Sequence, residues 1–353
     1  DVYKRQQLVA VSAPILIPIK EDGIQVMMTN CAQRAAPIGR LPVLLTVLLL
    51  GACGGGGSNG PRTGVVSIAV TDAPIDQGIE KVSVQFTGLE LKPESGPPIV
   101  FDFGADNERN IDLLQLQGEG SSYLIIDEAV PAGRYPWVRL LVNARKDDYD
   151  SYIEKDGGRY PLYIPSGAER GLQLVSGFVV PAGGSADFVI DWNLAQSIHA
   201  PDGQDLNHYL RPALRIADRA VSGVIRGTVA SELIDENNPI TCSGGNRAYL
   251  FARPDDGSET PIDDLDMRDD DRAEVLTTAR VEYSVDRDAW EFVFGFVAPG
   301  SYTVAFTCSA TADDPAVDDY PAPADAGLAE SEFDFHSRTD VDVEVAADAE
   351  VTF

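Results

Sequence analysis

The sequence is poor in positive charge, in histidine and cysteine, and in long apolar runs. Lysine and arginine number 27 against 56 aspartates and glutamates, so the formal net charge is −29. This charge repels the phosphates of nucleic acid and of anionic lipid headgroups, which argues against both as partners. Only four lysines follow residue 53: Lys81, Lys92, Lys146 and Lys155. Such a surface suits an envelope protein in salty water, where screening weakens self-repulsion.

The longest apolar run, residues 41–52, is far shorter than the ~20 residues that a membrane-spanning helix needs. Arg34 and Arg40 precede it, small residues end it, and Cys53 follows, which is the layout of a secretory signal. The junction resembles the lipobox of bacterial lipoproteins. That resemblance implies that Cys53 carries a lipid, and the glycine after it implies sorting to the outer membrane. A buried core helix is the alternative, but the glycine-rich stretch that follows would leave it without a packing partner.

The predicted secretory signal divides the start of the chain into three segments. The first methionines are Met27 and Met28. We therefore expect residues 1–26 to be an upstream extension that belongs to no domain, residues 27–52 to be the signal peptide, and residues 53–62 to be the lipidated cysteine and a flexible tether.

The four cysteines allow one further prediction. Cys31 lies in the signal and Cys53 is the lipid site, which leaves Cys242 and Cys308. An even pair outside the cytoplasm is typical of a disulfide. It would close a loop of roughly 65 residues and stabilise the fold by about 4 kcal/mol. Two free thiols or half a metal site are the alternatives.

Short strands separated by Gly/Pro turns predict an all-β fold of two β-sandwich domains in series, at residues 63–220 and 221–353. Period-two alternation is clear at 66–70, 82–86 and 137–142. The stretch 110–116 fits a short helix or a strand equally. Pro-x-Gly corners begin at Pro131 and Pro181, a similar Pro-Gly corner begins at Pro299, and no long amphipathic helix is evident.

The first of these domains resembles a bacterial lipoprotein family with a domain of unknown function, of the DUF4382 type. The residues that carry the likeness are Thr71-Asp72-Ala73-Pro74, Ile111-Asp112-Leu113-Leu114, and the corner from Pro131 to Tyr135. The resemblance implies secretion, lipid anchoring and a β-rich domain, and it supplies no catalytic residues. The second domain is similar to the prealbumin-like sandwich of carboxypeptidase regulatory-like modules, through Gly223 to Val229 and the corner from Phe296 to Val304. It has no lysine, so an internal Lys–Asn crosslink is excluded.

Several acidic runs offer oxygen ligands for Ca²⁺. The weak candidates are Asp263, Asp264, Asp266, Asp269 and Asp271. None of the runs has the spaced Asp-x-Asp-x-Asp-Gly order with a distal glutamate, so we expect solvated acidic loops, with structural Ca²⁺ as the alternative. The three histidines lack the companions that a tetrahedral zinc site requires. We expect no cofactor beyond this structural Ca²⁺.

Two tyrosines are candidates for a ligand platform. Tyr149 and Tyr152 lie in a charged turn, where an exposed ring can stack on a sugar. Aromatic residues in strands more often belong to the core. Asp72, in Thr-Asp-Ala-Pro, is expected to cap a strand-end turn through its side chain.

No catalytic motif is present: there is no Gly-x-Ser-x-Gly elbow and no Ser-x-x-Lys box. The sequence therefore predicts a lipid-anchored envelope protein, not an enzyme, with a binding or scaffold role toward a protein or glycan. The alternatives are a hydrolase of envelope polysaccharide and a calcium-dependent adhesive module. Carboxylates with raised pKa in a deep groove would favour the hydrolase.

Overall fold

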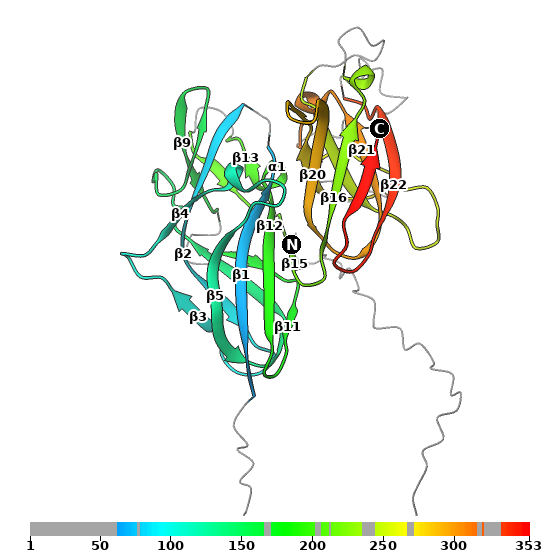
Figure 1. Ribbon diagram of the computed structural model, residues 1–353. Coiled ribbons are helices and arrows are strands. Elements are labelled where there is room, and N and C mark those ends of the chain that lie inside the picture. Colours follow the sequence, from blue (N-terminus) through cyan, green and yellow to red (C-terminus); the bar gives the residue numbers. More distant parts are fainter. Residues whose placement is uncertain are drawn as a thin grey trace, which may run out of the picture. The chain divides into compact units, whose positions relative to one another are not determined.

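Alternating apolar and polar side chains form β-strands in almost every segment of the computed structural model (Figure 1). The described residues are 62–75, 78–165, 171–201, 206–211, 213–234, 244–266, 272–315, 320 and 333–353. Cys53, Cys242, Asp269, Asp271, the predicted signal and all of the tether except Arg62 lie outside them. Within the described residues, no helix is long and apolar enough to cross a membrane.

The strands up to residue 218 form two main sheets. The first contains β1 (Thr63–Ala73), β5 (Ser122–Pro131), β12 (Ser185–Asn193) and β15 (Leu214–Asp218), in the order β15-β12-β1-β5. The second contains β2 (Ile79–Lys92), β3 (Ile99–Asp102), β4 (Arg109–Asp112), β7 (Trp137–Val142), β8 (Tyr152–Lys155), β9 (Gly158–Tyr163), β10 (Leu172–Leu174), β13 (Ile198–His199) and β14 (His208–Leu210). Its order is β10-β7-β2-β8-β9-β14-β13, and β3 and β4 also pair with β2. A small ribbon joins β6 (Gly133–Tyr135) to β11 (Phe178–Val180).

The strands from residue 223 onward form two four-stranded sheets. One contains β16 (Gly223–Val229), β19 (Glu282–Ser284), β20 (Ala289–Val297) and β23 (Ala349–Thr352), in the order β19-β20-β16-β23. The other contains β17 (Arg247–Ala252), β18 (Val275–Arg280), β21 (Gly300–Thr307) and β22 (Ser337–Val343), in the order β18-β17-β21-β22. Among the described strands, no sheet mixes the two stretches. The predicted domain boundary at residue 220 stays a prediction, because the pairing of strands into sheets does not show that each stretch folds by itself.

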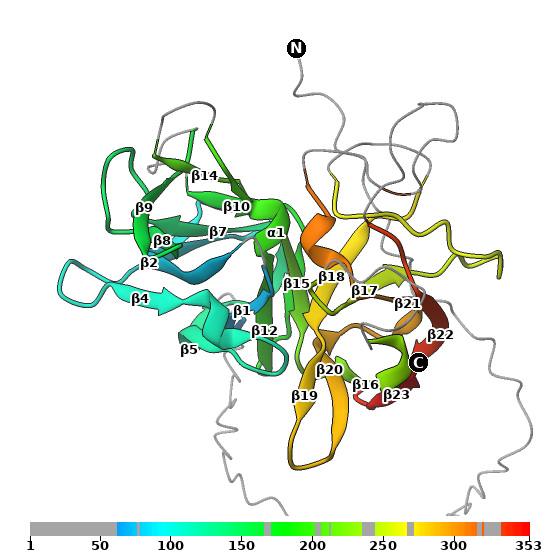
Figure 2. The same cartoon turned by 90° about the horizontal axis from the view of Figure 1, so that it is seen from above.

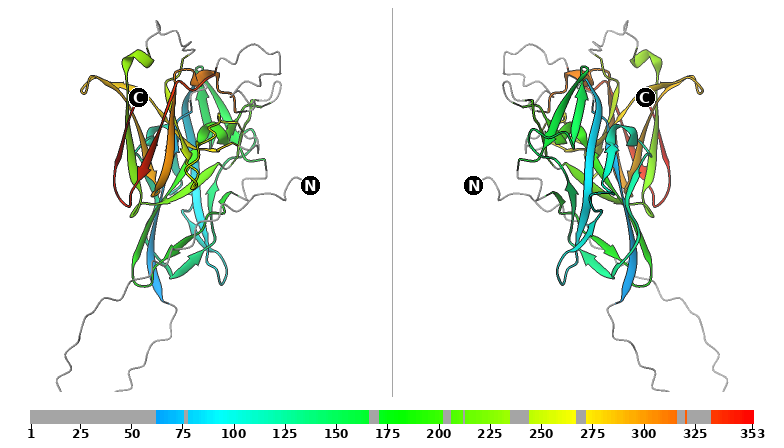
Figure 3. Two further views of the ribbon diagram at one scale, coloured as in Figure 1. Left: turned by 90° about the vertical axis from the view of Figure 1, so that its right-hand side faces the viewer. Right: turned by 90° about the vertical axis from the view of Figure 1, so that its left-hand side faces the viewer.

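Helix is scarce throughout these ranges. The one α-helix among them is α1 (Leu194–Ser197), and short 3-10 turns occur at Leu113–Leu116, Ser231–Leu233 and Ala310–Ala312. The undecided stretch 110–116 is therefore both kinds of structure, because β4 ends at Asp112 and a 3-10 turn follows. The side views show strands joined by loops (Figure 3). The all-β prediction with sandwich-type sheets is confirmed.

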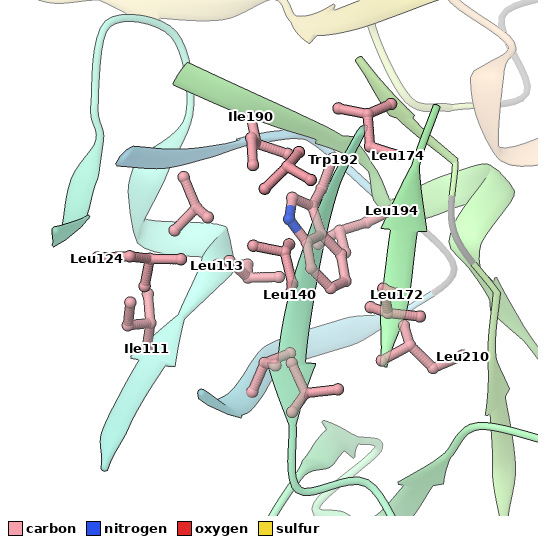
Figure 4. Packing of buried hydrophobic residues seen from close by; sticks show 14 of the residues in the cluster. Ile111, Leu113, Leu124, Leu140, Leu172, Leu174, Ile190, Trp192, Leu194 and Leu210 are labelled. Atoms are coloured by element: carbon pink, nitrogen blue, oxygen red, sulfur yellow. The ribbon is translucent and has the colours of Figure 1, made fainter. Parts of the chain in front are cut away.

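The largest buried side chain is Trp192, which is fully enclosed. Its ring meets Phe86 edge-on, with 6.1 Å between centroids. Leu140, Leu172 and Leu194 surround it in Figure 4. The same apolar cluster continues into Tyr249 and Phe251 of β17 and into Ile262 and Leu265 of the loop that follows β17. The two sets of sheets therefore share part of one core.

Two of the predicted Pro/Gly corners are each closed by a hydrogen bond from a tyrosine hydroxyl to a backbone carbonyl. The Tyr135 hydroxyl donates to the carbonyl of Pro131 at 2.6 Å, and the Tyr302 hydroxyl donates to that of Ala298 at 2.7 Å. Burial raises the pKa of both phenols. Each tyrosine thus fixes the chain direction where it enters a new strand.

Candidate functional site

The loop between β7 and β8 presents the two tyrosines singled out in the sequence. Ser151 is fully buried beneath this loop: its hydroxyl donates to the Asn143 carbonyl at 2.7 Å and accepts from the Gln85 amide at 3.0 Å. These bonds fix both ends of the loop against β2. As a result Tyr149 stands 49% exposed, whereas Tyr152, the first residue of β8, is partly covered.

A polar hollow of about 280 Å³ lies beside these rings, and we call it the tyrosine hollow. Its lining offers phenol, hydroxyl, amide, carboxylate and ammonium groups from Lys81, Ser83, Gln85, Asn110, Asp112, Tyr149, Asp150 and Tyr152.

Hydrogen bonds hold several of the lining groups in fixed orientations. Asn143 donates from Nδ2 to Gln85 Oε1 at 2.8 Å and to Asp150 Oδ2 at 2.5 Å. Gln85 in turn donates to Asn110 Oδ1 at 3.3 Å. Such a network presents donors and acceptors at set positions, which favours recognition of a polar ligand over loose adhesion.

Cations cover the Tyr152 ring. The Arg159 guanidinium carbon lies 4.1 Å from the ring centroid, and the Lys81 ammonium lies 5.9 Å from it. Arg159 also bonds Glu154 at 2.8 Å, and this bond raises the pKa of Arg159. The more open face for stacking therefore belongs to Tyr149, and Tyr152 forms a wall of the hollow.

The sequence did not single out Lys81, Ser83, Gln85, Asn110 and Asp112. A sequence pattern could have revealed them, however. Lys81, Ser83 and Gln85 occupy every second position along β2, and Asn110 and Asp112 do the same along β4. Period-two polar positions on paired strands share one face of a sheet.

Three of the proposed calcium ligands lie together. Asp263, Asp264 and Asp266 are all buried, and one carboxylate oxygen from each falls within 4.8 Å of the others. Arg272 already bonds Asp263 at 3.0 Å, and the Asp266 amide donates to Asp264 Oδ1 at 3.1 Å. These oxygens could hold a hard cation, but a guanidinium competes for one of them.

Asp313, which follows the 3-10 turn Ala310–Ala312, contacts this loop from a distant part of the chain. It accepts a hydrogen bond from the Leu265 amide at 3.2 Å and another from the Tyr249 hydroxyl. This carboxylate therefore fastens the loop that carries Asp263, Asp264 and Asp266.

Cys308 is fully buried, and its Sγ lies 3.5 Å from His336 Nε2. The carbonyl of Cys308 accepts from the amide of Gly244, two residues after Cys242, at 3.1 Å. The described backbone thus brings the neighbourhood of Cys242 to Cys308, while the disulfide itself stays a prediction. Burial lowers the pKa of His336, and also of His199 and His208.

The expected turn cap at Asp72 is wrong. The strand continues through Ala73, and Asp72 pairs in register with Trp192. Its side chain is only 4% exposed, and neither carboxylate oxygen has a hydrogen-bond partner in the described structure. Desolvation raises the pKa of Asp72 well above the usual range, and the charge of Asp191 adds to this.

Comparison with known proteins identifies part of the chain. A family model described as a domain of unknown function, DUF4382, matches residues 63–212. This confirms the DUF4382 resemblance of the first predicted domain. The lipoprotein and carboxypeptidase regulatory-like resemblances stay predictions. No curated protein matches the chain.

Three solved structures illustrate the remote likenesses. The Bacillus anthracis TIE protein is 10% identical, with a TM-score of 0.17, over 82% of this chain and 34% of its own. The chain thus spans about a third of that protein's length. The minor pilin GBS52 of Streptococcus agalactiae is 10% identical, with a TM-score of 0.16, over 81% and 94%. The major pilin T-13 of Streptococcus pyogenes is 11% identical, with a TM-score of 0.15, over 82% and 96%. TM-scores this low carry no argument about function.

Proposed function

We propose that this chain is a non-enzymatic binding protein of the bacterial cell envelope, and that it holds a glycan in the tyrosine hollow. The observation that carries the proposal is the pairing of an exposed Tyr149 ring with a fixed set of amide, hydroxyl and carboxylate groups. Sugars present one apolar face and many hydroxyls, so an aromatic surface beside ordered donors and acceptors is complementary to them.

A glycan array followed by calorimetry tests this proposal on the full chain. Tyr149→Ala should abolish or strongly weaken binding of the best glycan, because the stacking face is removed. Tyr283→Ala is the matched control, since Tyr283 is 46% exposed on β19, outside the tyrosine hollow. Binding that survives Tyr149→Ala, or that falls equally with Tyr283→Ala, would refute this site.

The anchor is a separate part of the proposal. Lipid on Cys53 would moor the chain to the outer membrane through the tether, which leaves the tyrosine hollow free for a partner. Cys53→Ser should release the protein into the soluble fraction. A Cys53→Ser protein that still sediments with membranes would contradict lipid anchoring without touching the glycan proposal.

Calcium binding is the second candidate function, favoured by the converging oxygens of Asp263, Asp264 and Asp266. Ca²⁺ at about 100 times its Kd would stabilise the folded protein by about 2.7 kcal/mol. Asp264→Asn should remove the rise in Tm, whereas Asp255→Asn, in an exposed turn, should keep it. An unchanged Tm in excess Ca²⁺ and in EDTA would exclude the site. The hydrolase alternative asks for carboxylates with raised pKa in a deep groove; Asp72 has a raised pKa, but it lines a crevice of only about 10 Å³.

A further inference from the structure

A second recess lies away from the tyrosine hollow, where the turn at 117–119 meets β18, β19 and β20. This groove has a volume of about 350 Å³. A crevice of about 10 Å³ borders it, because Gly118, Thr278 and Val293 line both. Figure 2 shows β15 and β18 side by side.

The crevice is lined by oxygen atoms from buried side chains, including Asp72, Asp191, Thr71, Thr277 and Thr278. Three of these side chains are already engaged, and the Thr278 hydroxyl donates to the carbonyl of Pro74 at 3.5 Å. The Thr71 hydroxyl contacts the carbonyls of Leu116 and Gly120 at 2.7 and 2.6 Å, and Asp191 accepts from Arg215 at 2.7 Å. The carboxylate of Asp72 has no hydrogen-bond partner in the described structure. The space in the crevice fits one group the size of a water molecule.

Four charged groups act on Asp72 from the surrounding elements. Asp191 on β12 and Asp112 on β4 raise its pKa, whereas Arg280 on β18 and Arg247 on β17 lower it. Neither guanidinium donates a hydrogen bond to Asp72. Arg280 instead donates to the carbonyl of Ile75 at 2.8 Å. A buried carboxylate left without a donor is costly, which marks such positions as candidates for binding.

The groove favours a cation with an aliphatic stem. Its carboxylates are Glu119, Glu282 and Glu291, against the single guanidinium of Arg280. Tyr283 adds an exposed ring, which packs edge-on against Trp290 with 5.4 Å between centroids. No lysine is among the residues that line the groove or the crevice. The guanidiniums of Arg215, Arg247 and Arg280 lie near Asp72, but none of them donates a hydrogen bond to it, so a cation that bonds Asp72 would come from another molecule.

We propose that the groove and crevice form a binding site for a primary ammonium group, which sits against Asp72 while its alkyl chain lies in the groove. An ammonium matches the water-sized space and offers three donors to a carboxylate that has none. The source is a lysine side chain of a partner protein or a free polyamine. This site is separate from the tyrosine hollow and does not depend on glycan binding.

The binding also has a proton signature. Burial favours the protonated form of Asp72 in the empty crevice, whereas an ammonium favours the carboxylate. Binding therefore releases a proton from Asp72, and affinity rises with pH over the range in which the empty site titrates.

Calorimetry on the full chain with Nα-acetyl-lysine amide tests the proposal, with the norleucine analogue and cadaverine as second and third probes. We expect the lysine probe to bind and the norleucine analogue not to bind. Asp72→Asn should weaken binding about tenfold or more. Glu344→Gln, an exposed charge-matched control, should leave it unchanged. Heats measured in two buffers of different ionisation enthalpy should reveal the released proton.

A second variant keeps the test decisive if Asp72→Asn misfolds. Ser284→Trp fills the groove without touching Asp72 and should also weaken binding. Tighter binding of cadaverine than of the lysine probe identifies a polyamine source, and the reverse identifies a protein. Equal binding by Asp72→Asn, binding of norleucine, or a response to Na⁺ with none to either amine would overturn the proposal.

Discussion

Asp72→Asn should make the protein more stable at neutral and alkaline pH. Asp72 is 4% exposed and both of its oxygens lack a hydrogen-bond donor, so ionisation inside the fold is opposed by desolvation and by Asp191. An amide has the same shape and carries no charge. Removing the charge from an unsatisfied buried acceptor in this way is worth about 1–3 kcal/mol, which raises Tm by a few degrees in a protein of this size.

The sign of the pH dependence follows from the raised pKa of Asp72. The folded state holds this proton to a higher pH than the unfolded chain, whose aspartate titrates near 3.8. The stabilisation by protonated Asp72 is complete below that pH and is lost as pH rises through the pKa of the folded state. The advantage of Asp72→Asn should therefore be near zero at about pH 3 and reach its full size above the folded pKa.

Urea unfolding at several pH values measures the effect, and Asp191→Asn provides a matched contrast. Asp191 bonds Arg215 at 2.7 Å, so its loss should destabilise the protein by about 1–3 kcal/mol instead. A stability gain for Asp72→Asn that is constant with pH, or a loss at alkaline pH, would refute the assignment of Asp72 as an unpartnered buried acid.

Three further predictions concern the fold. Tyr302→Phe should cost about 0.5–1.5 kcal/mol by urea unfolding, because the corner bond to the Ala298 carbonyl is lost; an unchanged midpoint would contradict that role. Gly295→Ala places a Cβ 2.1 Å from the Gly118 carbonyl oxygen and should cost about 1–3 kcal/mol, and a neutral result would mean that this close approach is absent. Mass spectrometry without reductant should find Cys308 joined to Cys242, with a lower Tm after reduction; a free thiol at Cys308 would exclude the pair.

Local alternation explains why most strands could be predicted. The run 137–142 is the whole of β7, and 66–70 and 82–86 fall inside β1 and β2. In 137–142 buried and partly exposed side chains alternate, whereas all five residues of 66–70 are buried and their period shows only in the change between larger and smaller side chains. A search for paired alternation would also have found the polar rows of β2 and β4.

Contacts between segments that lie far apart in the sequence could not be predicted from local alternation. The residues Thr-Asp-Ala-Pro have the composition of a turn, but pairing with β12 keeps the strand extended and encloses Asp72. The partner residue, Trp192, lies 120 positions later. Likewise, the groove combines a turn of the first sheets with strands of the later ones. No local pattern encodes either arrangement, because both depend on tertiary pairing.

The position of β1 has a consequence for how the chain reaches its native state. β1 lies between β5 and β12, with β12 parallel to it. The amino-terminal strand therefore lacks one neighbour until residue 193 has emerged from the ribosome or the export channel. Such distant pairing slows folding and leaves an early strand exposed.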